Sequence, residues 1–169
     1  MKFWVKITAV FIIGVFAFLT AYLYVEVGGY KKYLTAVKNY SSELGVDVSL
    51  VLAVMKTESG FDRHATSTKG AKGLMQLKQD TAEFIAKKIG YELEIDLYNA
   101  ETNIYLGVNY IKYLTQKFVA LDKVLWAYNA GEGSVRAWIE KGATVPPYKE
   151  TRNFTKRVLR RLNIYKVLI

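Results

Sequence analysis

The sequence predicts one compact, mainly α-helical domain that follows an apolar N-terminal helix. Three observations support this fold class. The chain has 169 residues, which is enough for one sizeable hydrophobic core. From residue 28 onward the apolar residues recur at helical spacing, and the alternation typical of strands is almost absent. Residues 7–25 contain no charged side chain.

The uncharged run predicts a membrane anchor. As a helix, 19 residues extend roughly 28 Å, close to the hydrocarbon thickness of a bilayer. Lys2 and Lys6 precede the run and favour a cytoplasmic N-terminus, although Lys31 and Lys32 beyond it weaken this bias. We therefore expect a single-pass anchor within residues 1–27, with the rest of the chain on the outer side of the cell membrane.

Two other interpretations of the run remain open. One is a cleaved signal peptide, whose apolar core usually spans about 7–15 residues and ends at a small-x-small site. Here the run is longer and ends in the bulky Tyr22, Tyr24 and Val25, and the segment 27–29 is the only weak cleavage candidate. The other is a buried core helix. We favour the uncleaved anchor.

The remaining elements are predicted in order along the chain. Residues 28–45 form a hinge and a lead-in helix that Gly45 ends. Asp47 caps the next helix, which runs to Gly60 and begins the main domain, residues 46–169. A polar, glycine-rich loop that can hold a small hairpin follows at 59–73. Further helices are expected at residues 80–89, 101–118, 122–128, 132–140 and 149–167.

Composition excludes several kinds of chemistry. The chain has no cysteine, which rules out disulfides, thiolate nucleophiles and cysteine-ligated zinc. Its single histidine, His64, rules out metal sites that need two, and a Ser-His-Asp triad would have to use it. What remains is carboxylate chemistry, binding or a structural role, and we expect no metal and no cofactor.

The chain is basic, with 24 Lys and Arg against 15 Asp and Glu. A basic domain beside a membrane can meet polyanionic wall polymers, anionic lipid head groups or nucleic acid. Six cations and no acid fall in the last stretch, where three of them share one helical face. A solvated face on a closing helix is the interpretation we favour for this stretch.

Glu58 is the candidate acid. It lies in the last turn of a strongly apolar helix, just before Ser59 and Gly60. The negative end of the helix dipole and apolar surroundings both disfavour the ionised carboxylate, so its pKa is expected to rise. A raised pKa is what a general acid requires near neutral pH. On these grounds alone, a solvated surface glutamate remains the more common situation.

The segments around Glu58 carry a family resemblance. "ESGFDRHATSTKGAKGLMQL" at 58–77, "ETNIYLGVNYIKYL" at 101–114, "AYNAGEGSV" at 127–135 and "ETRNFTKRVL" at 150–159 follow one another in the chain. In this order they resemble the motifs of SLT-type lytic transglycosylases, which are relatives of goose-type lysozyme. The resemblance covers about residues 40–160 and implies a lysozyme-like α+β superfold. Arg63, Gln79 and Ala100 stand where prolines are common in the family, and Phe154 where tyrosine is usual.

The resemblance implies a set of site residues. Glu58 matches the catalytic acid/base. Positions that line the family's glycan groove correspond to Ser67, Gly73, Met75, Gln76, Tyr128, Asn129 and Glu150. Amide side chains among these suit N-acetyl and hydroxyl groups, and Met75 and Tyr128 offer apolar faces to a sugar ring. We expect Glu150 to have a structural or orienting role, such as pairing with an arginine, and His64 to lie on the surface.

The implied reaction is cleavage of the β-1,4 bond between N-acetylmuramic acid and N-acetylglucosamine in peptidoglycan, with Glu58 as the single acid/base and a 1,6-anhydro product. A wall-spanning, secretion or conjugation complex is a further partner that the resemblance leaves open.

Two alternatives stay open. One is a muramidase that hydrolyses the same bond with Asp62, Glu101 or Glu150 as second carboxylate. The other is a non-catalytic glycan-binding scaffold. Nucleic acid is not expected as a partner, because no nucleic-acid-binding motif is present.

Overall fold

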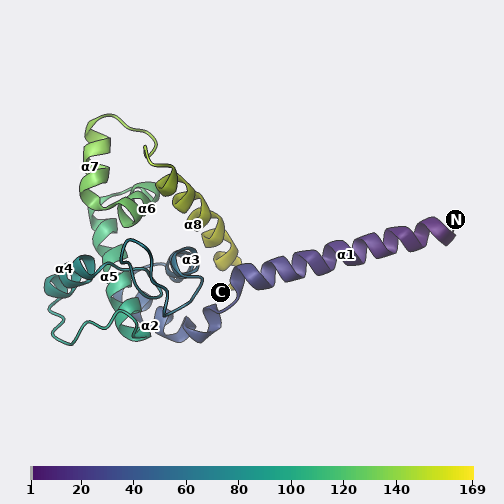
Figure 1. The fold of residues 1–169 in the computed structure, drawn as a ribbon, viewed down its shortest axis with the longest axis horizontal. Helices are drawn as coiled ribbons and strands as arrows, with labels where there is room; N and C mark the ends of the chain where they lie inside the picture. The colour runs from purple at the N-terminus through teal and green to yellow at the C-terminus, as the bar shows by residue number, and fades with distance from the viewer. Residues whose placement is uncertain (1) are drawn as a thin grey trace.

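The computed structural model describes the backbone of residues 2–169 and their side chains, except those of residues 2–6, 8, 9, 23, 26 and 27. Its elements are α1 (Lys2–Val27), η1 (Tyr30–Lys32), α2 (Leu34–Leu44), α3 (Val48–Glu58), α4 (Gln79–Ile89), α5 (Ala100–Lys117), α6 (Leu121–Ala130), α7 (Glu132–Glu140) and α8 (Lys149–Leu168) (Figure 1). Over these residues, β-structure is limited to isolated antiparallel bridges that pair Lys72 with Thr66 and with Leu77. The predicted mainly helical fold is confirmed.

The helices begin and end close to where the sequence predicts. The carboxylate of Asp47 accepts a hydrogen bond from the backbone N–H of Ser49, so the expected cap of α3 is confirmed. The lead-in helix differs from the prediction. It is broken at Tyr33, whose backbone N–H bonds to the carbonyl oxygen of Tyr30 and closes a short 3₁₀ turn before α2. The Tyr33 side chain is buried there, which fixes the bend.

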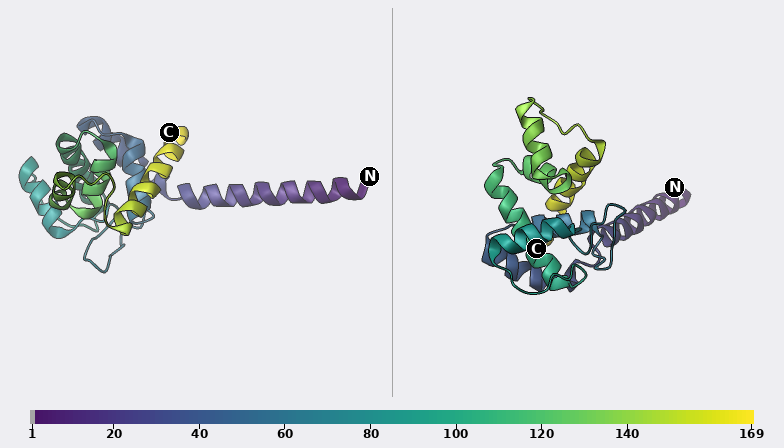
Figure 2. Two further views of the ribbon diagram at one scale, coloured as in Figure 1. Left: turned by 90° about the horizontal axis from the view of Figure 1, so that it is seen from above. Right: turned by 60° about the vertical axis from the view of Figure 1, so that its left-hand side comes forward.

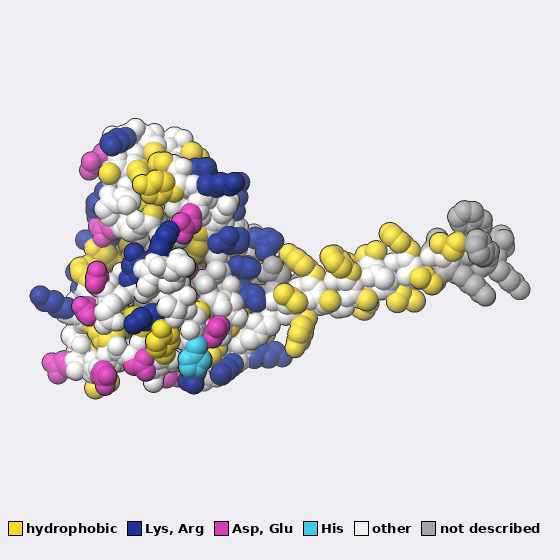
Figure 3. Space-filling model, viewed as in Figure 1, with side chains coloured by type: hydrophobic (Ala, Val, Ile, Leu, Met, Phe, Trp, Pro, Cys, Tyr) yellow, Lys and Arg dark blue, Asp and Glu magenta, His cyan; other side chains and the backbone are white. Residues whose placement is uncertain are grey.

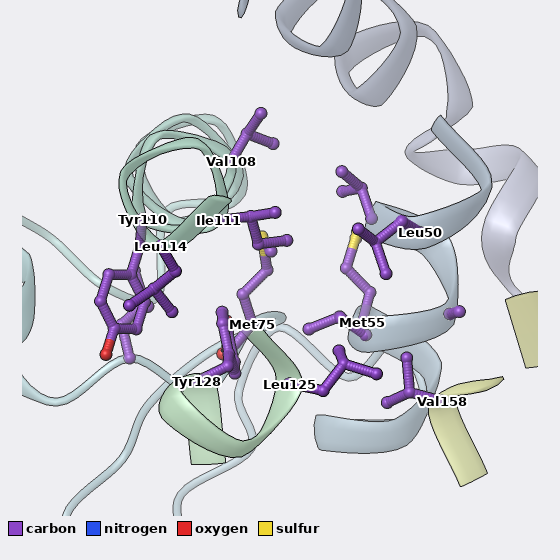
Figure 4. Close-up of a cluster of buried hydrophobic side chains, with 14 of the residues drawn as sticks. Leu50, Met55, Met75, Val108, Tyr110, Ile111, Leu114, Leu125, Tyr128 and Val158 are labelled. Atoms are coloured by element: carbon purple, nitrogen blue, oxygen red, sulfur yellow. The ribbon is translucent and has the colours of Figure 1, made fainter. Parts of the chain in front are cut away.

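α3 is the central helix of the core. Its residues 49–55 are all buried, and it packs along much of its length against α8. The middle of α5 is buried in the same way, and α6 bridges α5 and α8. Figure 4 shows side chains of α3, α5, α6 and α8 meeting around Met55 and Met75. The end of α3 is therefore held from several sides.

The helix α1 extends away from the rest of the molecule (Figures 1 and 2). Its described apolar side chains are exposed; Phe11 and Phe16, for example, keep 71% and 68% of their surface (Figure 3). At its C-terminal end, the Lys56 ammonium of α3 donates a 2.7 Å hydrogen bond to the carbonyl oxygen of Val25. Within the part of the chain that the structure describes, no helix is long and apolar enough to cross a membrane.

Candidate active site

Glu58 lies at the C-terminal end of α3, beside a cavity of about 530 Å³. The cavity lies between the loop that follows α3, the middle of α5, the end of α6 and the start of α8. Its lining comprises Glu58, Ser67, Thr68, Lys69, Ala71, Gln76, Leu77, Lys78, Thr81, Tyr110, Tyr128, Asn129, Ala130, Gly131, Tyr148, Glu150 and Thr151. Acidic, amide, hydroxyl and aromatic groups thus surround a space wide enough for a ring-shaped polar ligand.

Burial dominates the electrostatics of Glu58. Loss of water around its carboxyl group raises the pKa to about 8, and the negative charge of Glu150 acts in the same direction. The guanidinium of Arg157 opposes this rise without cancelling it. At neutral pH the carboxyl group therefore holds a proton in the folded protein. The direction predicted from the sequence is confirmed, and its main cause is burial.

The turn after Glu58 is fixed by Ser59. The Ser59 hydroxyl donates a 2.8 Å hydrogen bond to the carbonyl oxygen of Leu74 and accepts a 3.1 Å bond from the backbone N–H of Phe61. Phe61 adopts a φ of 72°, in the left-handed region, and its buried ring meets that of Tyr165 edge-on. The end of α3 is thereby tied to the loop that carries Gln76 and to α8.

Gln76 lines the cavity from a strained backbone position. Its φ is 48°, which is uncommon for a residue other than glycine. The side-chain amide N–H₂ donates hydrogen bonds of 3.0 Å to the carbonyl oxygens of Ala65 and Gly73. These bonds use the nitrogen only, and the amide oxygen takes part in neither. Gln76 is thus held in place while its acceptor stays suited to a ligand hydroxyl or N–H.

Gly73 and Met75 are not among the residues that line the cavity. Met75 is fully buried in the core, between the end of α3 and α5 (Figure 4). Its sulfur lies so close to Gly107 that a Cβ there would be 2.2 Å away. At Gly73 a Cβ would lie 2.1 Å from the carbonyl oxygen of Leu97 and 2.4 Å from the Asn103 amide nitrogen. Both residues therefore pack the loop against α5, and Met75 offers no free face to a sugar ring.

Asn103 is the residue on α5 that receives this loop, and it was not among the predicted site residues. It is completely buried. Its amide oxygen accepts a 2.8 Å bond from the Met75 N–H, and its amide nitrogen donates to the carbonyl oxygens of Lys72 and Leu97. Three backbone groups in the loop region are satisfied by one side chain. Its place in the segment 101–114 was the only sequence signal available.

Tyr128 lies behind the cavity and is 9% exposed. Its hydroxyl donates a 2.7 Å hydrogen bond to the carbonyl oxygen of Met75. The ring stacks on Phe154 at 6.1 Å, with 4° between the planes, and lies 5.2 Å from the ring of Tyr110. Phe154, which replaces the usual tyrosine, is thus a buried support for Tyr128. Asn129, the next residue, is partly buried and also lines the cavity.

Ser67 and Glu150 lie at the cavity mouth. The Ser67 hydroxyl accepts hydrogen bonds from the backbone N–H groups of Lys69 and Ala71, which shapes the loop. The Lys69 ammonium bonds to a Glu150 carboxylate oxygen at 2.7 Å, and both side chains are about two-thirds exposed. The sequence predicted an arginine partner for Glu150, and in the structure its ion-pair partner is this lysine.

Glu150 is the only one of the three candidate second carboxylates that lines the cavity. Asp62 is exposed and accepts a hydrogen bond from the His64 N–H. Glu101 accepts a 2.7 Å bond from the Tyr40 hydroxyl. In the described part of the chain, no group of three or more His, Cys, Asp and Glu side chains is arranged to hold a metal ion.

Several cavity residues were not predicted from the sequence. Those with polar or aromatic side chains are Thr68, Lys69, Lys78, Thr81, Tyr110, Tyr148 and Thr151. Except for Tyr110 in the middle of α5, they come from loops and the first turns of helices, where no hydrophobic period tells which way a side chain points.

Comparison with known proteins is consistent with this geometry. Residues 35–150 match the family model described as the transglycosylase SLT domain. The chain is 34% identical over 136 residues to the soluble lytic murein transglycosylase of Escherichia coli K12, covering 72% of this chain and 21% of that protein. It is 40% identical over 116 residues to the membrane-bound lytic murein transglycosylase C of Edwardsiella ictaluri, covering 62% and 32%.

The structure is similar to that of the 70 kDa soluble lytic transglycosylase Slt70 from Escherichia coli. The TM-score is 0.76 at 31% sequence identity, over 80% of this chain and 24% of the other. The chain thus spans about a fifth to a third of the length of the relatives that it matches.

Proposed function

Since the chain belongs to the family of the transglycosylase SLT domain, we propose that it is a lytic transglycosylase of peptidoglycan. Its substrate is the β-1,4 bond between N-acetylmuramic acid and N-acetylglucosamine. The names of the relatives, lytic murein transglycosylases, support this reaction class. The observation that carries the proposal is the Glu58 carboxyl group beside a polar cavity, with a pKa raised to about 8 by burial.

Glu58 acts first as a general acid. Its carboxyl proton moves to the glycosidic oxygen as the bond from that oxygen to C1 of the muramic acid breaks. Positive charge then develops at C1 and the ring oxygen. The Glu58 carboxylate formed in this step lies close to that charge and stabilises it. The released chain carries the new hydroxyl group.

Glu58 acts next as a general base. The C6 hydroxyl of the same muramic acid attacks C1, and its proton returns to the Glu58 carboxylate. A 1,6-anhydro ring forms, no water is consumed, and the enzyme ends in its starting protonation state. Well-placed intramolecular nucleophiles reach effective molarities of about 10⁵–10⁸ M. One carboxyl group is therefore sufficient for the whole cycle.

The remaining site residues have binding or supporting roles in this proposal. Gln76 and Asn129 exchange hydrogen bonds with N-acetyl and hydroxyl groups of the sugar. Tyr128 lines the back of the cavity, and Ser67 and Glu150 shape its mouth. Gly73 and Met75 act indirectly, by holding the loop of Gln76 against α5.

We also propose that the protein is bound to the cell membrane. In this proposal residues 1–27 form an anchor that crosses at residues 7–25, residues 28–45 are the hinge and lead-in helix, and the catalytic domain of residues 46–169 lies on the outer side. The uncharged run and the exposed apolar side chains of α1 support it. So does the similarity to a relative named as membrane-bound. Co-sedimentation with membranes after an alkaline carbonate wash, together with protease accessibility in spheroplasts, tests it.

Mass spectrometry of soluble products tests the reaction. The full chain in mild detergent is incubated with purified peptidoglycan, beside its Glu58→Gln variant. Muropeptides one water lighter than their reducing-end counterparts, absent with the variant, support the proposal. Reducing-end products lost with Glu58→Gln would make the protein a muramidase. Glycan binding without products in either protein would make it a binding scaffold.

A further inference from the structure

We propose that a basic collar around the base of α1 binds the anionic phospholipid head groups of the membrane, and so sets the orientation of the folded domain. The collar consists of Lys31, Lys32, Lys56, Arg160, Arg161 and Lys166. This inference rests on the proposed membrane association of α1 and does not depend on the reaction.

The collar residues come from three elements that meet where α1 ends. Lys31 and Lys32 are exposed on η1, which follows α1 after two glycines. Lys56 bonds to the Val25 carbonyl oxygen and so lies against the last turns of α1. The others lie on the C-terminal half of α8, which comes close to the base of α1 in Figures 1 and 2. The cations thus surround the point where α1 leaves the domain.

Packing holds these elements in a fixed arrangement. The ring of Tyr30 on η1 meets that of Tyr165 on α8 edge-on, with centroids 5.7 Å apart. The Arg161 guanidinium donates a 3.0 Å hydrogen bond to the Thr57 hydroxyl of α3. The collar residues on η1, α3 and α8 therefore keep their positions relative to one another, and the hydrogen bond from Lys56 to the Val25 carbonyl oxygen links them to the end of α1. A membrane that holds α1 therefore lies next to this group of cations.

The sequence excludes acids from two of the three contributing segments. No Asp or Glu occurs in residues 28–40 or in residues 151–169. Figure 3 shows Lys and Arg side chains gathered next to the base of α1, while most acidic side chains visible in this view lie farther away. Apart from Glu26, which precedes the two glycines in the sequence, the charge around the end of α1 is therefore mainly positive.

The position of the collar favours lipid over a soluble polyanion. The exposed rings of Tyr22 and Tyr24 lie just before the end of α1, and tyrosine is enriched at membrane–water boundaries. Lys31 follows Tyr24 by seven positions, and Lys56 contacts the carbonyl oxygen of Val25, the residue next to Tyr24. Cations attract an anionic membrane surface over about one Debye length, about 8 Å at physiological salt, so only cations near the membrane boundary contribute. The cations thus come soon after the apolar run, with Glu26 as the one acid between Tyr24 and Lys31, in the order in which a bilayer presents its hydrocarbon and its head groups.

Energy transfer to labelled head groups tests the proposal. The chain has no cysteine, so Asn163→Cys on the exposed side of α8 gives one labelling site in the full chain. The labelled protein is reconstituted into phosphatidylcholine vesicles, with or without phosphatidylglycerol, that contain an acceptor-labelled lipid. We expect transfer to increase about twofold with the anionic lipid and to lose that increase in high salt.

A pair of matched variants locates the effect. Lys31→Glu with Lys166→Glu changes two exposed collar residues, and should abolish the response to anionic lipid. Lys87→Glu with Lys141→Glu makes the same charge change at exposed positions on α4 and after α7, away from α1, and should leave the response intact. The measurement in high salt uses the protein with its collar unchanged, so it still tests the proposal if a variant folds poorly.

Three results would overturn the inference. The first is equal energy transfer in vesicles with and without phosphatidylglycerol, and the second is an equal loss of the response to phosphatidylglycerol in both pairs of variants. The third is binding to immobilised nucleic acid or polyglycerol phosphate that depends on the collar, without any response to anionic lipid. If the full chain does not rise with either kind of vesicle in a density gradient, the result is different, because it contradicts the membrane association itself. Peptidoglycan cleavage is measured separately and would stand or fall on its own.

Discussion

The Tyr128 hydroxyl donates a 2.7 Å hydrogen bond to the carbonyl oxygen of Met75, a residue 53 positions earlier in the chain. This bond joins the end of α6 to the loop that carries Gln76. Both partners are buried, so the Met75 carbonyl oxygen cannot form a replacement hydrogen bond with solvent if the hydroxyl is removed. The back wall of the cavity thus depends on one long-range contact between a side chain and the backbone.

Tyr128→Phe should destabilise the protein while keeping the ring stacked on Phe154. We expect a loss of about 1–2 kcal/mol in the free energy of unfolding, because a buried carbonyl loses its donor. Urea denaturation measures it. Tyr110→Phe is the control, since its hydroxyl lies 3.4 Å from the Ala127 carbonyl oxygen and makes a weaker bond. Equal losses in the two variants would contradict the assigned role.

Activity should fall as pH rises through about 8, because Glu58 then loses the proton that the reaction needs. Two charges near Glu58 should move this falling limb in opposite directions. Glu150→Gln removes a negative charge and lowers the pKa, so the limb moves to lower pH. Arg157→Gln removes a positive charge and moves it to higher pH. Each displacement should be roughly half a pH unit.

Release of soluble muropeptides across the pH range measures both displacements. Lys156→Gln changes the exposed neighbour of Arg157 on α8 and serves as the control, with no movement of the limb expected. Movement of both limbs in the same direction would show that Glu58 is not the group whose ionisation limits the rate.

Glu58→Gln should stabilise the folded protein at alkaline pH while it abolishes activity. The folded pKa of about 8 lies above the unfolded value near 4.5, so the stability that this group contributes is complete below about pH 4.5 and is lost as pH rises through about 8. Glutamine carries no charge to bury. The difference in unfolding free energy between variant and wild type should grow by roughly 2–4 kcal/mol between pH 4 and pH 9. Thermal denaturation at a series of pH values checks this, and a constant difference would argue against burial as the cause.

Gly73→Ala should be among the most damaging single substitutions outside the catalytic group. The φ of 75° strains any residue with a Cβ, and this Cβ would overlap the Leu97 carbonyl oxygen and the Asn103 amide. We expect a loss of about 3–5 kcal/mol or failure to fold.

Gly70→Ala is the matched control for that substitution. It has nearly the same φ, 78°, with no atom within 4 Å of the added Cβ. Backbone strain alone should cost about 1–2 kcal/mol there. Chemical denaturation compares the two, and similar losses would show that the close approach to α5 is unimportant.

The helical part of the fold was largely predictable from the sequence, because its signals are local. The carboxylate of Asp47 caps the helix that it precedes, and the apolar spacing that leads to Glu58 gives a helix that ends there. Residues 65–77 have no such period. Their direction is set by positive φ at Gly73 and Gln76 and by hydrogen bonds of Met75 and Lys72 to Asn103, 28 and 31 positions away. This is why Met75 points into the core.

The pairing of Glu150 with Lys69 was equally beyond sequence reasoning, since 81 residues separate them. Helical spacing predicts which residues of one helix share a face of that helix. It does not predict which loop, distant in the sequence, will contact the first turn of the helix. The residues that line the cavity from loops and helix ends were missed for the same reason.

The assembly of the cavity also links the protonation of Glu58 to folding. The other residues that line the cavity beside Glu58 extend from residue 67 to residue 151, so the raised pKa of its carboxyl group depends on a fold that brings distant parts of the chain together. In an unfolded chain, Glu58 is an ordinary ionised carboxylate at neutral pH and has no proton to give. The general acid that the proposed reaction needs is therefore present only in the folded protein.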